Sequence, residues 1–511
     1  MQPLVFTVAI EAAAPSLQDN TGDIDRLKKA VSAATGIALT IPLGRMGEIA
    51  ANFRRFGFKG AALINDLPAG AVLVDFLAEQ PRSLPAMALD LGTTHLEASL
   101  LNLVDGRVLA RSNRENSQIE FGADILTRIH YAAKDSGLRR LHEIIVATIN
   151  ELAADLAAQA GEKKENIRAL AVSGNTTMVH LLLQLDPYHL CREPYIPLVN
   201  SPDPFAAAEI GLALHGAAPV WVMPSIGSYF GGDLISGIVA SRMDQQEETC
   251  MLIDVGTNAE VVVGNREWLI ACAGAAGPAL EGGVARMGMR AGPGAIEHVE
   301  IDPQTLELRC QTIDNGKPRG ICGSGIIDLV ACFYLARIID IRGKFRRERC
   351  PERFIDTPEG PAFVVAGAAE AASGEPVVLG QVDLDAMMRS KAAMYSILTT
   401  LINQVGLGFA DLHRIYVAGA FGRHIDPRRA ITLGMLPDLP LTTFQAIGNS
   451  SLAGAELILL HRADRERCRQ LVGKITYLEL NVNQEFMIRF SGCRFIPHTD
   501  TSLFPSVPVF D

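Results

Sequence analysis

Two stretches of this chain share one pattern of apolar and polar positions. In MALDLGTTHLEASL, residues 87–100, an apolar run ends at an Asp, passes through Gly-Thr-Thr and resumes as a second apolar run. MLIDVGTNAEVVV, residues 251–263, repeats this pattern. Apolar runs of this length, bounded by turn residues, predict β-hairpins. We therefore expect the same hairpin twice in one chain.

The turns of these hairpins indicate a phosphate and a cation. A tip of this composition leaves backbone N–H groups and hydroxyls that can hold a phosphate, and an Asp at the end of the first strand can hold a hydrated cation. Asp90 and Asp254 are therefore candidates for Mg²⁺, and Asp254 also for orienting an attacking water. The competing interpretation is that each Asp caps its own turn. Two copies indicate two lobes that close on one nucleotide.

Two further segments are predicted strands that enter helices through glycines. RALAVSGNTTMVHLLL, residues 168–183, turns at Gly-Asn-Thr-Thr, and RIYVAGAFGRHID, residues 414–426, turns at Gly-Ala-Phe-Gly. Glycines there let the backbone pass close to a flat ring or a phosphate. Asp233, in Gly-Gly-Asp-Leu, either faces the terminal phosphate or caps the helix that follows it. The alternation of strands and helices predicts an α/β fold.

Pro and Gly breaks divide the chain. The Pro-Arg-Ser-Leu-Pro stretch before the first hairpin marks a boundary. The division expected is a linker or edge strand over 1–22, a small α/β middle domain over 23–82, and a large domain over 83–511 with lobes at 83–248 and 249–511. A long helix around Lys391, with Met387, Met388, Met394 and Leu398 on one face, is expected to form core between the lobes. The run KITYLELNVNQEFMIRFSGCRFIPH is expected to extend a sheet.

Composition excludes several classes of function. The net charge is −11, which makes nucleic acid and anionic membranes poor partners. The start lacks a basic leader, and no apolar run reaches the roughly 18 residues that span a bilayer, so a cytoplasmic location is expected. The nine cysteines are scattered without a close pair, so the sequence predicts neither a disulfide framework nor a zinc site.

The order of these motifs resembles the ASKHA superfamily of sugar kinases, actins and heat-shock chaperones. The resemblance implies two ribonuclease-H-like lobes around ATP and Mg²⁺. It assigns phosphate loops to both hairpin turns, an interlobe connection to the Gly-Asn-Thr segment and an adenosine loop to the late Gly-x-x-Gly. The implied nucleotide-binding residues are Gly92, Thr93 and Thr94; Gly174, Asn175 and Thr176; Gly256, Thr257 and Asn258; and Gly419, Ala420 and Gly422.

Longer strings resemble a narrower family, the reductive activators of corrinoid proteins. They are AGPALEGGVARMGMRAGPGAIEHV, GICGSGIIDLVA and IPHTDTSLFPSVP, with APSLQDNTGDIDRL and NSQIEFGADILTRI nearer the start. The resemblance implies ATP-dependent reduction of cob(II)alamin to cob(I)alamin on a corrinoid protein of a methyltransferase system, by a homodimer. Members commonly carry an iron–sulfur domain before the linker. This chain starts at the linker and shows no cysteine cluster. Either it is a truncated or naturally shortened form that receives its electron from a separate ferredoxin-like donor, which is the expectation, or its function has changed.

Three other functions remain compatible with the motifs. A small-molecule ASKHA kinase would carry the same phosphate loops. An activator of the 2-hydroxyacyl-CoA dehydratase type would share an iron–sulfur cluster across a dimer, and Cys272 and Cys322 are the cysteines for it, although burial in glycine-rich packing is the simpler interpretation. A binding module would grip an oxidised corrinoid protein without reducing it.

Overall fold

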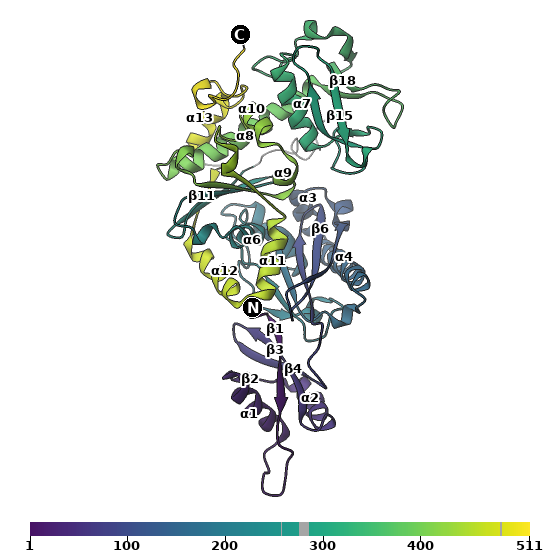
Figure 1. Ribbon diagram of the computed structural model, residues 1–511, viewed down its shortest axis with the longest axis vertical. Helices are drawn as coiled ribbons and strands as arrows, with labels where there is room; N and C mark the ends of the chain where they lie inside the picture. Colours follow the sequence, from purple (N-terminus) through teal and green to yellow (C-terminus); the bar gives the residue numbers. More distant parts are fainter. Residues whose placement is uncertain (257, 275–285, 481–482, 511) are drawn as a thin grey trace. The chain divides into compact units, whose positions relative to one another are not determined.

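The computed structural model describes residues 1–256, 258–274, 286–480 and 483–510. The chain forms two compact units, which are described separately (Figure 1). Unit 1 comprises Met1–Ala240 and Ser451–Gly473, and unit 2 comprises Ser241–Ser450 and Lys474–Asp511. Within the described part of the chain, no helix is long and apolar enough to cross a membrane.

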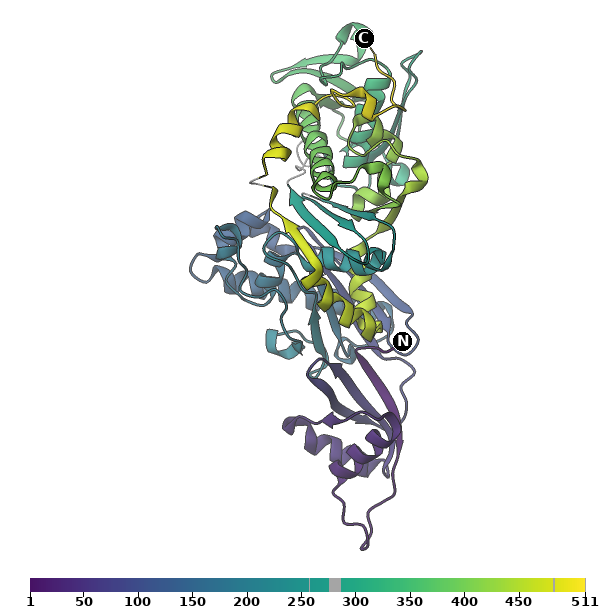
Figure 2. The ribbon, with the colours of Figure 1, turned by 90° about the vertical axis from the view of Figure 1, so that its left-hand side faces the viewer.

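Unit 1 begins with a small sheet covered by two helices. Its strand order is β1-β3-β4-β2, and both helices lie on one side of the sheet (Figure 2). The elements are β1 Val5–Glu11, α1 Asp23–Thr35, β2 Leu39–Thr40, α2 Leu43–Arg55, β3 Lys59–Leu67 and β4 Gly70–Leu77. Leu27 of α1 and Phe53 of α2 are fully buried in the core between these layers. Helix α1 begins at Asp23, and Gly36, whose φ is 73°, follows its last residue.

The N-terminal segment contributes a strand to the small sheet. Strand β1 pairs antiparallel with β3 from Val5 to Glu11, and it lies at the edge of the sheet. The segment therefore contains an edge strand, one of the two interpretations of its sequence, and the linker boundary expected at residue 22 stays a prediction.

The second sheet of unit 1 carries the first hairpin. Its order is β7-β6-β5-β8-β10-β9. Its strands are β5 Pro85–Leu91, β6 His95–Asn102, β7 Val108–Glu115, β8 Leu170–Gly174, β9 Phe205–Ala206 and β10 Pro219–Val222. The accompanying helices are α3 Ile125–Ala132, α4 Gly137–Gln159, α5 Thr176–Leu182 and α6 Gly232–Ser241.

Two late helices belong to unit 1 as well. Residues 451–473 take up most of α11 (Ser450–Leu460) and α12 (Arg462–Lys474). Ser99 of β6 donates a hydrogen bond of 2.7 Å to Glu456 of α11. Residues 451–473 therefore group with the first hairpin's sheet, and the lobe boundaries expected from the sequence stay predictions.

Unit 2 is built on a sheet that carries the second hairpin. Its order is β21-β20-β11-β12-β13-β22. Its strands are β11 Cys250–Val255, β12 Ala259–Gly264, β13 Leu269–Gly274, β20 Arg414–Ala418, β21 Phe444–Gly448 and β22 Ile475–Leu478. The helices that follow or cover it are α8 Gln381–Gln404, α9 Gly419–His424, α10 Pro427–Leu433 and α13 Gln484–Gly492. The expected strand extension stops at Leu478, because residues 484–492 are helical.

Two three-stranded sheets complete unit 2. One has the order β15-β14-β16 and the other β17-β18-β19. Their strands are β14 Ala295–Ile301, β15 Leu308–Thr312, β16 Gly320–Ile321, β17 Phe354–Thr357, β18 Gly360–Ala366 and β19 Val377–Gly380. Helix α7, Gly323–Leu335, is buried along almost its whole length and contributes to the unit's core.

The methionine face of α8 lies inside unit 2. Met387, Met388, Met394 and Leu398 are buried in that unit's own core, so the expected position between the lobes is corrected to one within a lobe. Lys391 is fully buried, and its Nζ donates to Phe495 O at 2.6 Å and to Pro497 O at 2.7 Å. Burial lowers the pKa of Lys391 from 10.5 to about 7.

The two large sheets share one layout. In each, three consecutive strands form an antiparallel meander, and the first of them also pairs in parallel with a later strand that leads into a helix. In unit 1 these are β5 and β8, and in unit 2 they are β11 and β20. The repeated hairpin in the sequence therefore reflects a repeated fold. Each copy places a hairpin turn beside a strand-to-helix turn.

Candidate functional site

The first candidate turn joins β5 to β6 in unit 1. Asp90 lies near the end of β5, directly opposite Glu97 of β6. Directly opposed side chains have Cβ atoms about 4.5–5.5 Å apart, so this pair places two carboxylates together. Between them, a Cβ on Gly92 would lie 2.2 Å from the carbonyl oxygen of His95, so the turn accepts only glycine at this position.

Two asparagines hold this turn in shape. Asn175 Nδ2 donates to Thr93 Oγ1 at 3.0 Å, while its side-chain oxygen accepts from Met178 N as the N-cap of α5. Asn116 Nδ2 donates to Gly92 O at 3.0 Å, and its backbone N–H donates to Thr94 O at 2.8 Å. The structure thus brings together Thr93 and Asn175, which the sequence predicts as site residues. It adds the fully buried Asn116, which sequence reasoning missed.

Glycines bring a third segment of unit 1 to the same place. A Cβ on Gly231 would lie 2.6 Å from Asn175 Cα and 2.5 Å from Asp233 Oδ1. A Cβ on Gly174 would lie 2.8 Å from Leu91 O. Asp233 is the second residue of α6, and its Oδ1 accepts from Leu234 N at 3.0 Å. The backbone segments lie so close together here that a residue larger than glycine at Gly174 or Gly231 would clash with its neighbours.

The Thr176 side chain is hydrogen-bonded to the loop that contains Gly227. Its side chain is 1% exposed, and its hydroxyl donates to Gly227 O at 3.0 Å. Thr94, in the hairpin turn, is half-buried. The hydroxyl of Thr176 is therefore engaged within the protein, and its contribution to a ligand would come from the backbone.

The second candidate turn joins β11 to β12 in unit 2. Asp254 lies directly opposite Glu260, as Asp90 lies opposite Glu97 in unit 1. The backbone N–H of Gly256 donates to Asn258 O at 2.9 Å, which closes a tight turn, and Asn258 is exposed. Thr257 lies outside the described residues.

The late glycine segment lies beside this turn within unit 2. Ala418 at the end of β20 is the parallel register partner of Asp254. Gly419 has a φ of +72°, and a Cβ there would lie 2.9 Å from Asp254 Oδ1. A Cβ on Gly422 would lie 2.2 Å from Val417 O. Ala420 is part of α9, and its side chain lies outside the described part of the chain.

Sequence reasoning missed the two glutamates of the acidic pairs. Glu97 and Glu260 each follow their turn on the returning strand, and the repeated string Asp-x-Gly-Thr followed shortly by Glu is the signal that points to them. Carboxylate oxygens are ligands that hard cations such as Mg²⁺ prefer. Within the described ranges, no group of three or more His, Cys, Asp or Glu residues is placed to hold a metal ion by itself.

The cysteines of the shared-cluster alternative lie in the interior of unit 2. Cys272 on β13 is fully buried, and burial raises the pKa of its thiol. Cys322 is 3% exposed, and its Sγ donates to Ile296 O at 3.2 Å. The burial of both side chains fits the packing interpretation.

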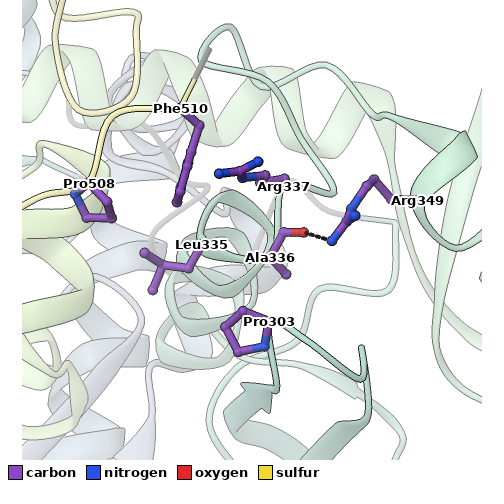
Figure 3. A pocket seen from close by; sticks show the side chains of 7 residues that line it. All are labelled: Pro303, Leu335, Ala336, Arg337, Arg349, Pro508 and Phe510. Carbon is purple, nitrogen blue, oxygen red and sulfur yellow. Dashed lines mark hydrogen bonds between the residues drawn. The ribbon is translucent and has the colours of Figure 1, made fainter.

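A separate cavity lies at the end of α7 in unit 2. It measures about 480 Å³ and is lined by Pro303, Leu335, Ala336, Arg337, Arg349, Pro508 and Phe510 (Figure 3). Arg349 Nη2 donates to Ala336 O at 3.3 Å, and the Arg337 guanidinium lies 4.5 Å from the centre of the Phe510 ring. Tyr334 OH donates to Pro508 O at 2.9 Å. The contacts of Arg337 and Tyr334 attach the C-terminal segment at the end of α7, and none of the nucleotide-site candidates lines the cavity.

Comparisons with known proteins identify the family. The model for the C-terminal domain of RACo, the ASKHA domain, matches residues 248–508. The models for the RACo middle region and the RACo linker region match residues 85–246 and 1–70. The linker match extends past the boundary expected at residue 22.

Individual relatives agree with these matches. The corrinoid activation enzyme RamQ of Eubacterium limosum is 29% identical over 477 residues, which is 91% of this chain and 79% of that protein. The [Co(II) methylated amine-specific corrinoid protein] reductase of Methanosarcina barkeri is 25% identical over 419 residues, which is 76% of this chain and 72% of that protein. A solved structure of a reductive activator for corrinoid, iron-sulfur protein superposes with a TM-score of 0.91 at 37% identity, covering 99% of this chain and 81% of that one. This chain therefore belongs to the RACo family of reductive activators of corrinoid proteins and carries that family's ASKHA domain.

Proposed function

We propose that this protein uses ATP to restore corrinoid proteins of a methyltransferase system, by reducing inactive cob(II)alamin to cob(I)alamin. Membership of the RACo family carries the proposal, together with two hairpin turns that each present an acidic pair beside a glycine-rich strand end. The relatives named above are a corrinoid activation enzyme and a corrinoid protein reductase. The substrate cobalt gains one electron, which a separate ferredoxin-like donor supplies.

The residues of both turns suit Mg-ATP. Asp90 and Asp254 would hold the hydrated Mg²⁺, because this ion keeps much of its water and uses few carboxylates. Asp254 would also orient the attacking water. Hydroxyls and backbone N–H groups at Gly92, Thr93, Thr94, Gly256, Thr257 and Asn258 would bind phosphates. Gly174, Asn175 and Thr176, the interlobe connection, would contact the nucleotide, and Gly419, Ala420 and Gly422 would bind the adenosine. Hydrolysis of ATP supplies the free energy for an otherwise unfavourable reduction.

Tighter binding of the reduced than of the oxidised corrinoid protein would be enough to couple ATP to this electron transfer. A conformation that binds the reduced corrinoid protein about 10⁴-fold more tightly than the oxidised one gains about 5.5 kcal/mol. For one electron, at about 59 mV for each factor of ten, this shifts the effective potential by about 0.2 V. Closure on ATP would favour that conformation. We further propose that the active species is a homodimer, which mass photometry would test.

A reconstituted cobalt assay tests the proposal. The protein is mixed with a corrinoid protein in the cob(II)alamin state and a low-potential chemical reductant, and cob(I)alamin absorbance is followed with and without Mg-ATP. We expect cob(I)alamin only when ATP and the intact protein are both present. Asp254→Asn and Asp90→Asn should abolish it, since the amide keeps the shape but loses the charge that holds Mg²⁺.

The matched control is Asp105→Asn. Asp105 accepts from Arg107 N at 3.0 Å in the turn after β6, so its substitution makes the same chemical change away from both hairpin turns. It should leave the cobalt signal unchanged. ATP hydrolysis without cob(I)alamin, across several corrinoid partners, would contradict the proposal and would turn attention to phosphorylated small-molecule products.

A further inference from the structure

The first turn of α11 contacts the candidate Mg²⁺ carboxylate of unit 1. Ser451 lies in that turn and is 6% exposed. Its Oγ donates to Asp90 Oδ1 at 2.7 Å and lies 2.9 Å from Ser173 Oγ. Asp90 and Ser451 are 361 positions apart in the chain, so this contact was not visible in the hairpin sequence.

The hydrogen bonds continue from Ser451 into the interior. Ser173 is the register partner of Asp90 on the neighbouring parallel strand β8, and it is fully buried. Its Oγ lies 2.7 Å from Ser236 Oγ on α6, which is also fully buried. Since a carboxylate only accepts, the proton of Ser451 goes to Asp90, and Ser451 can accept from Ser173 in turn. The carboxylate is thus one end of a buried chain of hydroxyls.

The packing of α11 fixes Ser451 in place. A Cβ on Gly454 would lie 2.4 Å from Ser236 Cβ and 2.5 Å from Ser236 Cα, so the two helices are in backbone contact one turn after Ser451. The bond from Ser99 to Glu456 attaches the same helix farther along. A donor held this firmly restricts the rotation of the carboxylate that it binds. The start of a helix also favours a negative charge, which adds to the same effect.

We infer that Ser451 is a positioning residue for Asp90. It holds one carboxylate oxygen of Asp90, and this directs the other oxygen to the side from which hydrated Mg²⁺ would be bound. The inference rests on the proposed function, because it requires that Asp90 helps to bind Mg-ATP. Ser451 itself does not touch the nucleotide or the metal. Its effect is on the orientation of Asp90 alone.

Removal of the Ser451 hydroxyl should selectively weaken the binding of Mg²⁺. In Ser451→Ala, Asp90 loses a charge-assisted hydrogen bond and samples other rotamers. We expect the Mg²⁺ concentration that half-saturates nucleotide binding to rise about tenfold, which corresponds to about 1.4 kcal/mol. Binding of the nucleotide without Mg²⁺ should not change. Ser451→Thr keeps a hydroxyl and should restore much of the intact protein's Mg²⁺ dependence.

Ser99→Ala provides a matched control. Ser99 lies on β6 of the sheet that carries Asp90, is fully buried, and donates a hydrogen bond of 2.7 Å to Glu456 of α11. This variant removes an equal hydroxyl contact to the same helix and leaves Asp90 untouched. Calorimetric titration with a non-hydrolysable ATP analogue, over a series of Mg²⁺ concentrations, measures both variants. Thermal unfolding of each reports how far the loss of a helix contact alone destabilises unit 1.

The outcomes separate this inference from the proposed function. A tenfold shift in Ser451→Ala that is absent in Ser99→Ala supports the positioning role. Equal half-saturating Mg²⁺ concentrations in the two variants would overturn it, while the proposed function would stand if Asp90→Asn still lost Mg²⁺-dependent binding. If Asp90→Asn bound Mg-nucleotide like the intact protein, the assignment of Mg²⁺ to Asp90 would fail, and the inference with it.

Discussion

Replacing Gly419 by alanine tests the link between the glycine segment and Asp254. Gly419 begins α9 with a φ of +72°, and the added Cβ would lie 2.9 Å from Asp254 Oδ1 and 3.5 Å from Val255 O. The substitution therefore has two effects at once. It strains the backbone, and it crowds the carboxylate that we assign to Mg²⁺ and water.

A second glycine separates these effects. Gly406 follows α8 with a φ of +69°, and its Cβ would meet no atom within 4 Å. Alanine in the left-handed region costs about 1–2 kcal/mol, so Gly406→Ala should lose about that much stability. Crowding of a packed site adds about 1–3 kcal/mol, which gives Gly419→Ala a loss of about 2–5 kcal/mol. The difference between the two variants measures the contact with Asp254.

Urea unfolding and nucleotide binding measure the two effects separately. The chain has two tryptophans, Trp221 in unit 1 and Trp268 in unit 2. In a Trp221→Phe background, fluorescence therefore reports on unit 2, which contains both glycines. We expect Gly406→Ala to keep its affinity for Mg-ATP and Gly419→Ala to lose at least tenfold. Equal stability losses, with affinity retained in both variants, would refute the close approach of Gly419 to Asp254 and its role in binding.

Two further predictions follow from buried polar groups. The pKa of Lys391 is about 7 in the folded protein and 10.5 ordinarily, so between these pH values the unfolded chain binds more protons than the folded one. The free energy of unfolding should therefore rise with pH through this window, by at most about 5 kcal/mol. Denaturant unfolding of the intact protein and of Lys391→Met at pH 7 and pH 9.5 checks this, and a slope that survives the substitution would assign it to another group. Asn175→Ala should lose about 1 kcal/mol of stability as a lost N-cap, and it should also weaken ATP binding because Thr93 loses a hydrogen bond. Asn483→Ala removes the N-cap of α13, which accepts from Phe486 N, and should lower stability without changing ATP binding. Thermal unfolding measures the stability of both variants, and calorimetry measures their ATP binding.

Much of the candidate site was predictable from local sequence. The strand-turn-strand pattern around Asp90 and Asp254 depends on neighbouring residues, because side-chain alternation and turn propensity act over a few positions. The same holds for the strands that end at Gly174 and Gly419. The repeat of one hairpin also predicted two lobes, and the two sheets do share one layout.

Local pattern failed where two structures fit the same residues. The segment around 484–492 contains enough apolar residues to be a strand, but it forms α13, whose N-cap Asn483 and packing against α8 favour the helix. Val5–Glu11 forms an edge strand because it pairs with β3, which lies far along the chain. In such cases the secondary structure depends on contacts with elements that lie far away in the sequence.

The sequence alone determined the hairpins, their carboxylates and the family. Only the tertiary structure showed that residues 451–473 belong to unit 1, although they follow residues 241–450 of unit 2 in the chain. It also brought Ser451 to Asp90 and Asn116 to the turn at Gly92. The physical reason is that hydrogen bonds and packing act over a few ångströms in space, whatever the separation along the chain, so residues hundreds of positions apart become neighbours only when the whole domain has folded.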